Sequence, residues 1–209
     1  WTAREGLLLE TRHYKSCNLG SLDSVRKAFE AAEPYGADYV DGVHHSHNPM
    51  TLRVAPFMSY YRGYLRVPSN GQYAFFTSSR DASFLLIDGK EVVSAPGAHR
   101  PMRRAKPGSG GRVQLSGGPH LFEYYHAATG GEAVMVAAWE QGPFGEKPQP
   151  EAIPPEYFRA GSVGRVAAGP PTVNGTPKYI PDFVVKIGGD VPLPDNPEPL
   201  VGVSFRDHS

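Results

Sequence analysis

Cysteine is nearly absent from this chain of 209 residues, since Cys17 is the only one. One cysteine excludes an internal disulfide and any C-x-x-C metal or redox motif. A lone cysteine is more often buried and inert than reactive, so it leaves the redox compartment open.

The chain also lacks an excess of charge and a long apolar run. Its 21 basic residues balance 21 acidic ones, which argues against nucleic acid or an anionic membrane as a partner. No apolar stretch approaches the roughly 18 residues of a spanning helix, so we expect no membrane span in this segment. Because it begins with Trp1 and ends in strand-like sequence, we expect a processed chain or an excerpt of a longer protein.

Catalytic motifs are missing as well. The sequence contains no nucleophile elbow, no phosphate-binding loop and no recognisable acid/base pair. We therefore expect that this segment is not an enzyme.

Glycine (24) and proline (21) are abundant and favour short strands joined by tight turns. Only residues 22–33, LDSVRKAFEAAE, carry a helical pattern, with Asp23 or Ser24 as the N-cap. The sequence thus predicts an all-β fold with one short helix.

Apolar residues alternate with period two along most of the remaining chain. Residues 59–67 and 72–79 flank the turn sequence PSNG, and residues 83–87 and 91–94 flank DGK, so each pair predicts a hairpin. Residues 111–139 add three more strands, and the natural assembly is an antiparallel β-sandwich. The alternation predicts these inward residues: Leu85, Ile87, Val92, Leu115, Phe122, Tyr124, Val134 and Val136.

Proline becomes dense after residue 141, since 13 of the 21 prolines lie between Gly142 and Pro199. Such density is typical of an extended connector that forms no ladder of its own. We predict a sandwich at 1–141, a Pro/Gly-rich linker at 142–181 and the start of a second β domain at 182–209.

The ordered motifs resemble a known family. GLLLE, YRGYLRVPSNGQYAFFTSSRDASFLLIDGKEVV, GRVQLSGGPHLFEYYH and AVMVAAWEQ together resemble the protective-antigen-type (PA14) domain over residues 6 to about 140. The tail resembles the start of an immunoglobulin-like or polycystic-kidney-type (PKD) domain. The resemblance implies a β-sandwich of an exported multidomain protein, extracellular or at the cell surface.

The resemblance also implies a possible calcium site. Lectin members of the family carry two successive aspartates, joined by a cis peptide bond, before Gly-Ser, and these hold calcium that binds sugar hydroxyls. Here the four residues are Arg80, Asp81, Ala82 and Ser83. Only Asp81 remains as a metal ligand, so we expect calcium binding to be weak or lost, and we predict no other cofactor. We do not expect a cis bond, which costs about 3 kcal/mol without proline.

Arg80 has three interpretations. It locks the turn by pairing with Asp81 or another loop carboxylate, or it donates a bidentate pair to a sugar carboxylate or sulfate, or the turn retains residual metal binding. The first is favoured.

Histidines and basic residues supply the other candidates. The stretch from Asp41 to His47, which includes His44 and His45, has two interpretations. Its histidines form a zinc or copper site, or they are simply solvated. His99 opens a basic stretch that is either a solvated loop or a patch for anionic glycan or a neighbouring protein. This stretch contains Arg100, Arg103, Arg104 and Lys106.

We predict ligand binding at Arg80, Asp81, His47 and His99, with glycans or neighbouring surface proteins as partners. The favoured function is a non-catalytic structural or protein-interaction module. The alternatives are a carbohydrate-binding, lectin-like module and an accessory domain of a secreted glycan-active enzyme.

Overall fold

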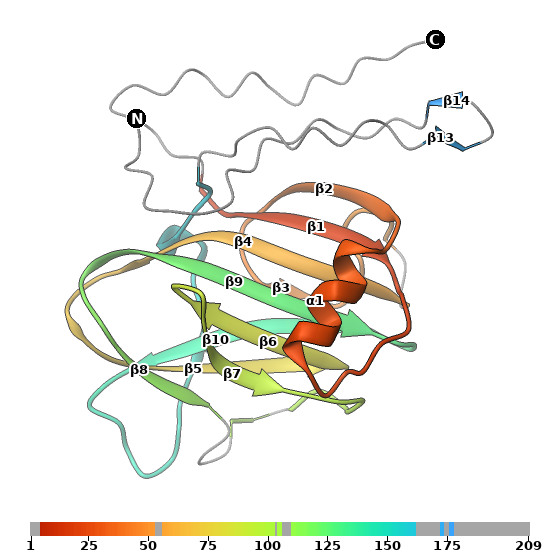
Figure 1. The fold of residues 1–209 in the computed structure, drawn as a ribbon. Helices are drawn as coiled ribbons and strands as arrows, with labels where there is room; N and C mark the ends of the chain where they lie inside the picture. The colour runs from red at the N-terminus through yellow and green to blue at the C-terminus, as the bar shows by residue number, and fades with distance from the viewer. Residues whose placement is uncertain are drawn as a thin grey trace, which may run out of the picture.

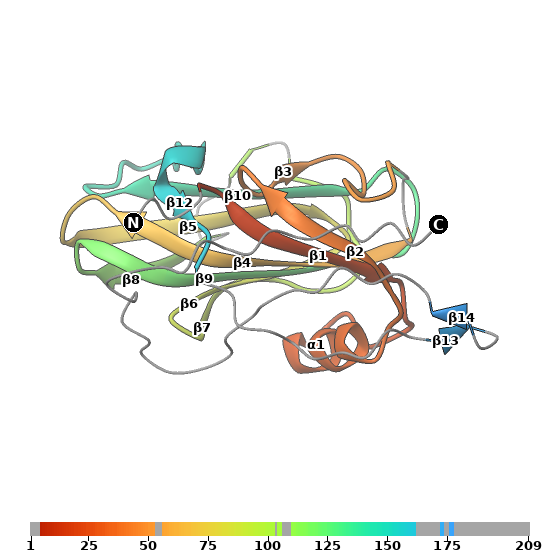
Figure 2. The same ribbon diagram turned by 90° about the horizontal axis from the view of Figure 1, so that it is seen from above.

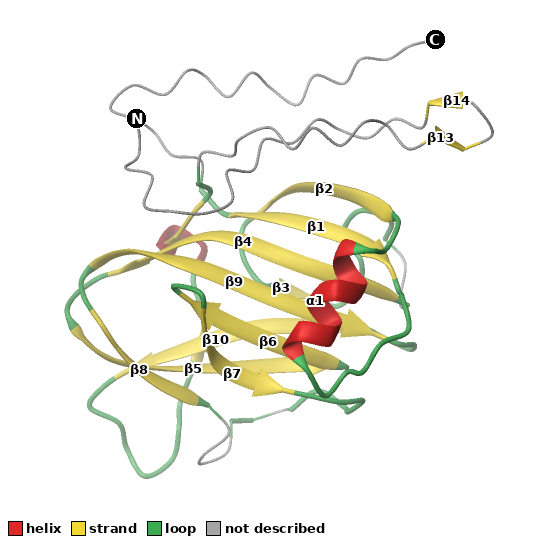
Figure 3. Cartoon of the chain, viewed as in Figure 1, coloured by secondary structure: helices red, strands yellow, loops and turns green. Residues whose placement is uncertain are grey.

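The computed structural model describes residues 5–52, 56–102, 104–105 and 110–161, together with the backbone of 172–173 and 176–177. Two antiparallel sheets pack face to face, and one helix lies outside them (Figures 1 and 2). Strands dominate the chain (Figure 3). The predicted all-β sandwich with one short helix is confirmed.

The larger sheet has seven strands. In spatial order they are β2 (Pro34–Val40), β1 (Leu7–His13), β4 (Phe57–Val67), β9 (Gly118–Ala128), β6 (Ala82–Ile87) and β7 (Lys90–Ala95), with β12 (Phe158–Arg159) also paired to β4. The second sheet contains β11 (Glu151–Ala152), β10 (Val134–Gln141), β5 (Gly71–Arg80) and β8 (Gly111–Leu115), with β3 (His44–His45) also paired to β10.

Helix α1 (Leu22–Glu30) covers the outer face of the larger sheet (Figure 2). Its buried residues Val25, Ala28 and Phe29 pack on the outward side chains of β4, β6 and β9. The N-cap is Ser21, whose hydroxyl accepts from the backbone N–H of Ser24, so the helix begins two or three residues earlier than the predicted N-caps Asp23 or Ser24 imply. Propensity alone could not separate these cap residues, because serine and aspartate are equally good caps.

Between the sheets lies a core of large apolar and aromatic side chains. Most predicted inward residues are buried there: Leu85, Ile87, Leu115, Phe122 and Tyr124. Val92 is partly buried and packs against this core. The prediction was wrong for Val134 and Val136, which are only partly buried and do not join it.

Strand β10 shows why the register was misassigned. Met135, Ala137 and Trp139 point inward, so the two valines face outward. All residues from Ala133 to Trp139 are apolar, so the pattern along this strand could not identify its buried face.

The β6–β7 hairpin is confirmed. Its turn residues Asp88 and Gly89 both have positive φ, at 51° and 74°. Positive φ at both central positions is typical of the tight turn that Asp-Gly favours.

The predicted hairpin between residues 59–67 and 72–79 is wrong. Strand β4 pairs with β1 and β9, whereas β5 pairs with β8 and β10 in the other sheet. The connection is therefore an arch between the sheets, in which the Asn70 side chain accepts from the backbone N–H of Gly117 at 2.6 Å. An Asn-Gly sequence specifies a turn but not which sheet receives the next strand.

The described part of the predicted linker, residues 142–161, packs on the sandwich. It contains β11, a 3-10 turn (Pro155–Tyr157) and β12, and Phe158 is fully buried. The Phe158 ring meets Phe122 edge to face at 5.0 Å between centroids. These residues pair with strands of the sandwich and not with one another, and apolar side chains between the prolines anchor them.

The rest of that prediction, residues 162–181 and the segment 182–209, lies outside the described residues, apart from the backbone pairing of β13 (Thr172–Val173) with β14 (Thr176–Pro177). Among the described residues, no helix has the length and apolar character needed to cross a membrane.

Candidate ligand site at one end of the sandwich

Loops gather where β1 and β9 end and where β4, β6 and β10 begin, at the right of Figure 1. The strand register fixes this arrangement, since His13 and Ala128 both lie opposite Phe57, and Arg80 lies opposite Val134. We call this region the loop end. Three of the four ligand-binding candidates from the sequence, Arg80, Asp81 and His99, lie close together at this end.

Arg80 and Asp81 form the turn by which the chain leaves one sheet for the other. β5 ends at Arg80 and β6 begins at Ala82, so Asp81 alone separates the strands. The Arg80–Asp81 peptide bond is cis, which corrects our expectation of a trans bond. Strand β9 fixes both sides of this bond. The Asp81 N–H donates to the Ala127 carbonyl at 3.1 Å, and His126 Nε2 lies 2.8 Å from the Arg80 carbonyl oxygen.

The Asp81 carboxylate is turned toward the loop that follows β9. Its Oδ2 accepts from the Thr129 N–H at 2.9 Å and from the Thr129 hydroxyl at 2.7 Å. Only 5% of Asp81 is exposed. These donors satisfy a buried carboxylate that would otherwise be costly to desolvate.

His126 supports the turn from inside the core. Burial lowers the pKa of its imidazole to about 4, and the charge of nearby His99 acts in the same direction. The ring is therefore neutral near pH 7, and Nε2 carries the proton that it donates to the Arg80 carbonyl. Its Nδ1 then accepts from the Ser59 hydroxyl at 3.2 Å.

The Arg80 guanidinium has no hydrogen bond or ion pair with any residue in the described parts of the chain. It lies against Gly131, where an added Cβ would come within 2.8 Å of Arg80 Cζ. The prediction that it pairs with a carboxylate or carbonyl is wrong for these residues. Thr129 holds the adjacent carboxylate instead.

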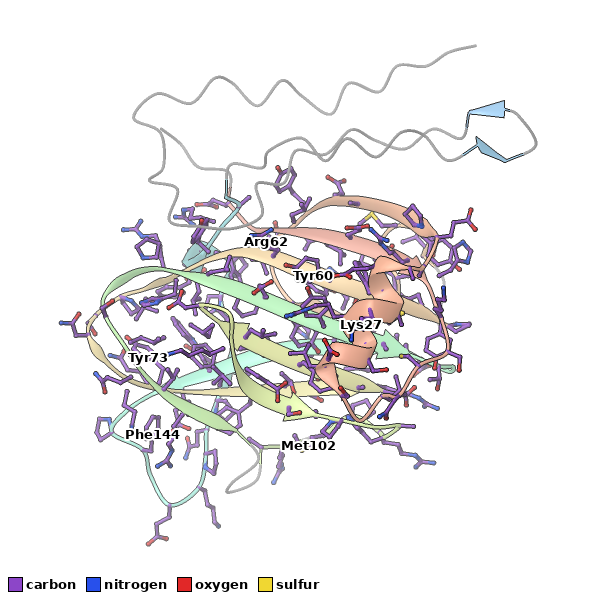
Figure 4. All side chains as sticks on the ribbon, viewed as in Figure 1. Lys27, Tyr60, Arg62, Tyr73, Met102 and Phe144 are labelled. Atoms are coloured by element: carbon purple, nitrogen blue, oxygen red, sulfur yellow. The ribbon has the colours of Figure 1, made fainter. Side chains whose placement is uncertain are left out.

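His99 and the start of the basic stretch lie beside this turn. The His99 ring nitrogens are 3.2 Å from the carbonyl oxygens of Ala95 and Arg100. The Ser78 hydroxyl donates to the Met102 carbonyl at 2.8 Å, so Met102, which Figure 4 labels, lies beside β5 two residues before Arg80.

His47 is separated from the other candidates. β3 pairs with β10 on the side opposite β5, with His45 across from Met135. Extending that register places His47 near the start of β10, with this strand between it and Arg80.

The zinc or copper alternative is not supported. Nδ1 of His45 lies 3.0 Å from the Tyr61 hydroxyl. Burial lowers the pKa of His45 to about 4, and the charges of His47 and His44 add to this effect. No group of three or more His, Cys, Asp or Glu side chains in the described residues could hold a metal ion.

Calcium does not fit the Arg80–Asp81 turn. The turn offers a single carboxylate, and two donors from Thr129 already occupy one of its oxygens. The neighbouring guanidinium brings a positive charge and no oxygen ligand, whereas calcium requires six to eight oxygens. We derive no calcium-dependent step for this site.

Comparisons with known proteins identify the fold. The PA14 domain family model matches residues 54–150. Residues 54–150 therefore belong to the PA14 domain family. No curated protein matches the sequence.

Several solved structures align with the chain at low identity. The "PA14 sugar-binding domain from RTX adhesin" has a TM-score of 0.60 and 18% identity, covering 76% of this chain and 100% of that one. The PA14 domain of MpAFP antifreeze protein has a TM-score of 0.60 and 13% identity, covering 74% and 90%. Epithelial adhesin 6 A domain from Candida glabrata, solved with Galb1-3GlcNAc, has a TM-score of 0.56 and 13% identity, covering 77% and 88%. At such identities the likeness shows the fold alone.

Two residues of this PA14 domain escaped the sequence reasoning. Thr129 and His126 hold the carboxylate and the carbonyl of the turn, although each is more than 40 residues away in sequence. Only the β6–β9 pairing, which places Ala82 opposite Ala127, brings them there. A buried histidine in an apolar strand was the one available signal.

Proposed function

We propose that this PA14 domain is a non-catalytic carbohydrate-binding module that contacts its ligand with the loop end. The observation that carries the proposal is the supported Arg80–Asp81 turn. A buried carboxylate, a neutral histidine and two strands hold this turn, yet the Arg80 guanidinium is left without a partner in the described residues. A rigid turn that presents unused donors suits recognition of oxygen-rich ligands.

The structural neighbours support the same assignment. The RTX adhesin domain is described as sugar-binding, and the Candida glabrata adhesin domains were solved with bound disaccharides. By analogy with these proteins, we place the module in an exported, multidomain protein outside the cell or at its surface. Glycans are then the partners of first choice.

Protein contact is the second candidate function. Leu52 is 77% exposed with φ of 54°, in the connection that leads from β3 to the start of β4 at the loop end. A single exposed leucine is ordinary on a protein surface and forms no apolar patch, so protein contact stays the second candidate.

An immobilised-glycan array tests the carbohydrate assignment. The wild type is compared with Arg80→Ala/His99→Ala at the loop end and with Arg66→Ala as the control, because Arg66 is exposed near the far end of β4. We expect the wild type and the control to bind the same glycans, and the double variant to lose them while keeping its melting temperature. Binding that survives the double variant would place the site elsewhere, and absence of any glycan binding would favour the protein-contact candidate.

A further inference from the structure

We infer that the loop end selects acidic sugars, and that the Arg80 guanidinium donates hydrogen bonds to the ligand's carboxylate or sulfate without calcium. This inference rests on the proposed carbohydrate function and goes beyond it by naming the ligand class.

The first argument is the unused donor capacity of Arg80. A guanidinium has five N–H donors in a planar fork that matches the two oxygens of a carboxylate or sulfate. None of these donors bonds a described residue, and Arg80 is neither fully buried nor fully exposed. A partly buried fork without an internal partner is a ready site for an external anion.

Positioning of the fork is the second argument. Gly131 has φ of 72° and no side chain, and the Arg80 guanidinium occupies the space that a Cβ there would fill. The backbone behind the fork is fixed by the hydrogen bond from His126 to the Arg80 carbonyl. The backbone that carries the fork is therefore positioned before a ligand arrives, and Gly131 leaves the guanidinium the space it occupies, which reduces the reorganisation that binding requires.

Competing negative charge is limited at this place. Both hydrogen bonds from Thr129 end on Asp81, which is almost fully buried. Glu132 is the exposed acid of the neighbouring loop and forms no ion pair with Arg80. An incoming anion thus meets a guanidinium that no described carboxylate has neutralised.

Local charge adds to this preference although the whole chain is neutral. The bond from Ser78 to Met102 places Met102 near the turn, and Arg100 and Arg104 lie two residues to either side of it in the chain. His99 lies at the start of the basic stretch. Basic groups on one side of a surface attract anions over about 8 to 10 Å at physiological ionic strength.

Isothermal titration with matched sugars tests the inference. The ligands are oligogalacturonate and its methyl ester, which differ only in the carboxylate charge, and a sulfated galacto-oligosaccharide and its desulfated form. Each is titrated into wild type, Arg80→Gln, Arg80→Lys and the control Arg66→Gln, with and without EDTA. Comparing the first pair with the second distinguishes a carboxylate ligand from a sulfate ligand.

We expect at least one charged sugar to bind more tightly than its neutral form, with no effect of EDTA. Arg80→Gln should weaken that binding by about tenfold or more. Arg80→Lys should weaken it less, because lysine keeps the positive charge, but still measurably, because lysine lacks the planar fork of donors. Arg66→Gln should bind as the wild type does, and added salt should weaken binding.

The outcomes separate the two proposals. Equal binding of charged and neutral sugars, or binding that EDTA abolishes, overturns the acidic-sugar inference and leaves the carbohydrate function standing. Charged-sugar binding that Arg80→Gln leaves unchanged also overturns the inference. Failure to bind any of these sugars, together with a blank glycan array, overturns both.

Discussion

Thr129 holds Asp81 with two hydrogen bonds, one from its backbone N–H and one from its hydroxyl, and both end on the same carboxylate oxygen. This relationship explains why Asp81 stays satisfied next to an arginine that does not pair with it. It also gives the loop end a specific point at which stability and ligand binding can be separated by mutation.

Replacing Thr129 by valine removes the hydroxyl donor and keeps the shape of the side chain. We expect a loss of about 1 to 2 kcal/mol in the free energy of unfolding, because a buried carboxylate loses one charged hydrogen bond. Urea denaturation measures it. Thr11→Val is the matched control, since the Thr11 hydroxyl is buried without a hydrogen-bond partner among the described residues and its removal should be neutral or stabilising. Equal losses in both variants would show that the Asp81 contact contributes nothing.

Acid should destabilise the domain through His126. Its pKa falls from 6.5 to about 4 on folding, so the unfolded chain binds this proton more readily than the folded one. The contribution of neutral His126 to the free energy of unfolding, about 3 kcal/mol, is fully present above pH 6.5 and is lost as the pH falls through 4.

Nuclear magnetic resonance titration of the His126 ring measures this directly, and unfolding experiments between pH 4 and 8 give the slope. His126→Gln keeps an N–H donor and removes the proton site, so its slope should be smaller. Titration of the wild-type ring near its ordinary value would contradict the prediction.

Truncation tests whether residues 142–161 belong to the sandwich. Phe158→Ala should cost about 3 to 5 kcal/mol, as expected for a fully buried ring in contact with Phe122. A chain ending at Gln141 should be less stable than one ending at Gly161 by at least this amount. Equal melting temperatures for the two truncated chains would restore the interpretation of this segment as a free connector.

Converting the turn toward the lectin pattern should create some calcium affinity. Arg80→Asp/Ala82→Gly places two carboxylates side by side where the wild type has one. We expect calcium in the millimolar range to raise the melting temperature of the double variant and not that of the wild type. Tight calcium binding by the wild type, lost in Asp81→Asn, would show that the Arg80 substitution has been misinterpreted.

Gly131→Ala should displace the Arg80 guanidinium while leaving the arginine itself unchanged. A Cβ at this position would collide with the guanidinium, whereas at Gly89 nothing lies within 4 Å of an added Cβ. Both glycines have positive φ, 72° and 74°, so both variants pay a similar backbone cost. Only Gly131→Ala should therefore weaken acidic-sugar binding in titration, and equal binding by both variants would remove Gly131 from the site.

Local chemistry made part of this structure predictable from the sequence. The Asp88–Gly89 hairpin and the apolar face of α1 follow from a few adjacent residues, and the structure contains both. The arch after β4 did not follow, because the Asn-Gly signal is the same whether the next strand joins the same sheet or the other one.

The candidate site was predictable only at its centre. Arg80 and Asp81 stood out because they depart from a family pattern. Their partners Thr129 and His126 come from a strand that only tertiary pairing brings near, so no sequence spacing could reveal them. The cis bond between Arg80 and Asp81 was also missed, because its local cost argues against it and only the surrounding contacts specify it.

The arch after β4 and the single-residue crossing at Asp81 also govern how this chain must fold. Phe57 in β4 pairs with Ala128 in β9, 71 positions later, while the intervening β5 lies in the opposite sheet. Neither sheet can be completed by a contiguous stretch of chain, so loop closure must precede most of the stabilising contacts. The domain should consequently fold on the millisecond-to-second scale of high-contact-order β proteins. Its two sheets should also be lost together on unfolding, since any contiguous fragment that contains all the strands of one sheet also contains strands of the other.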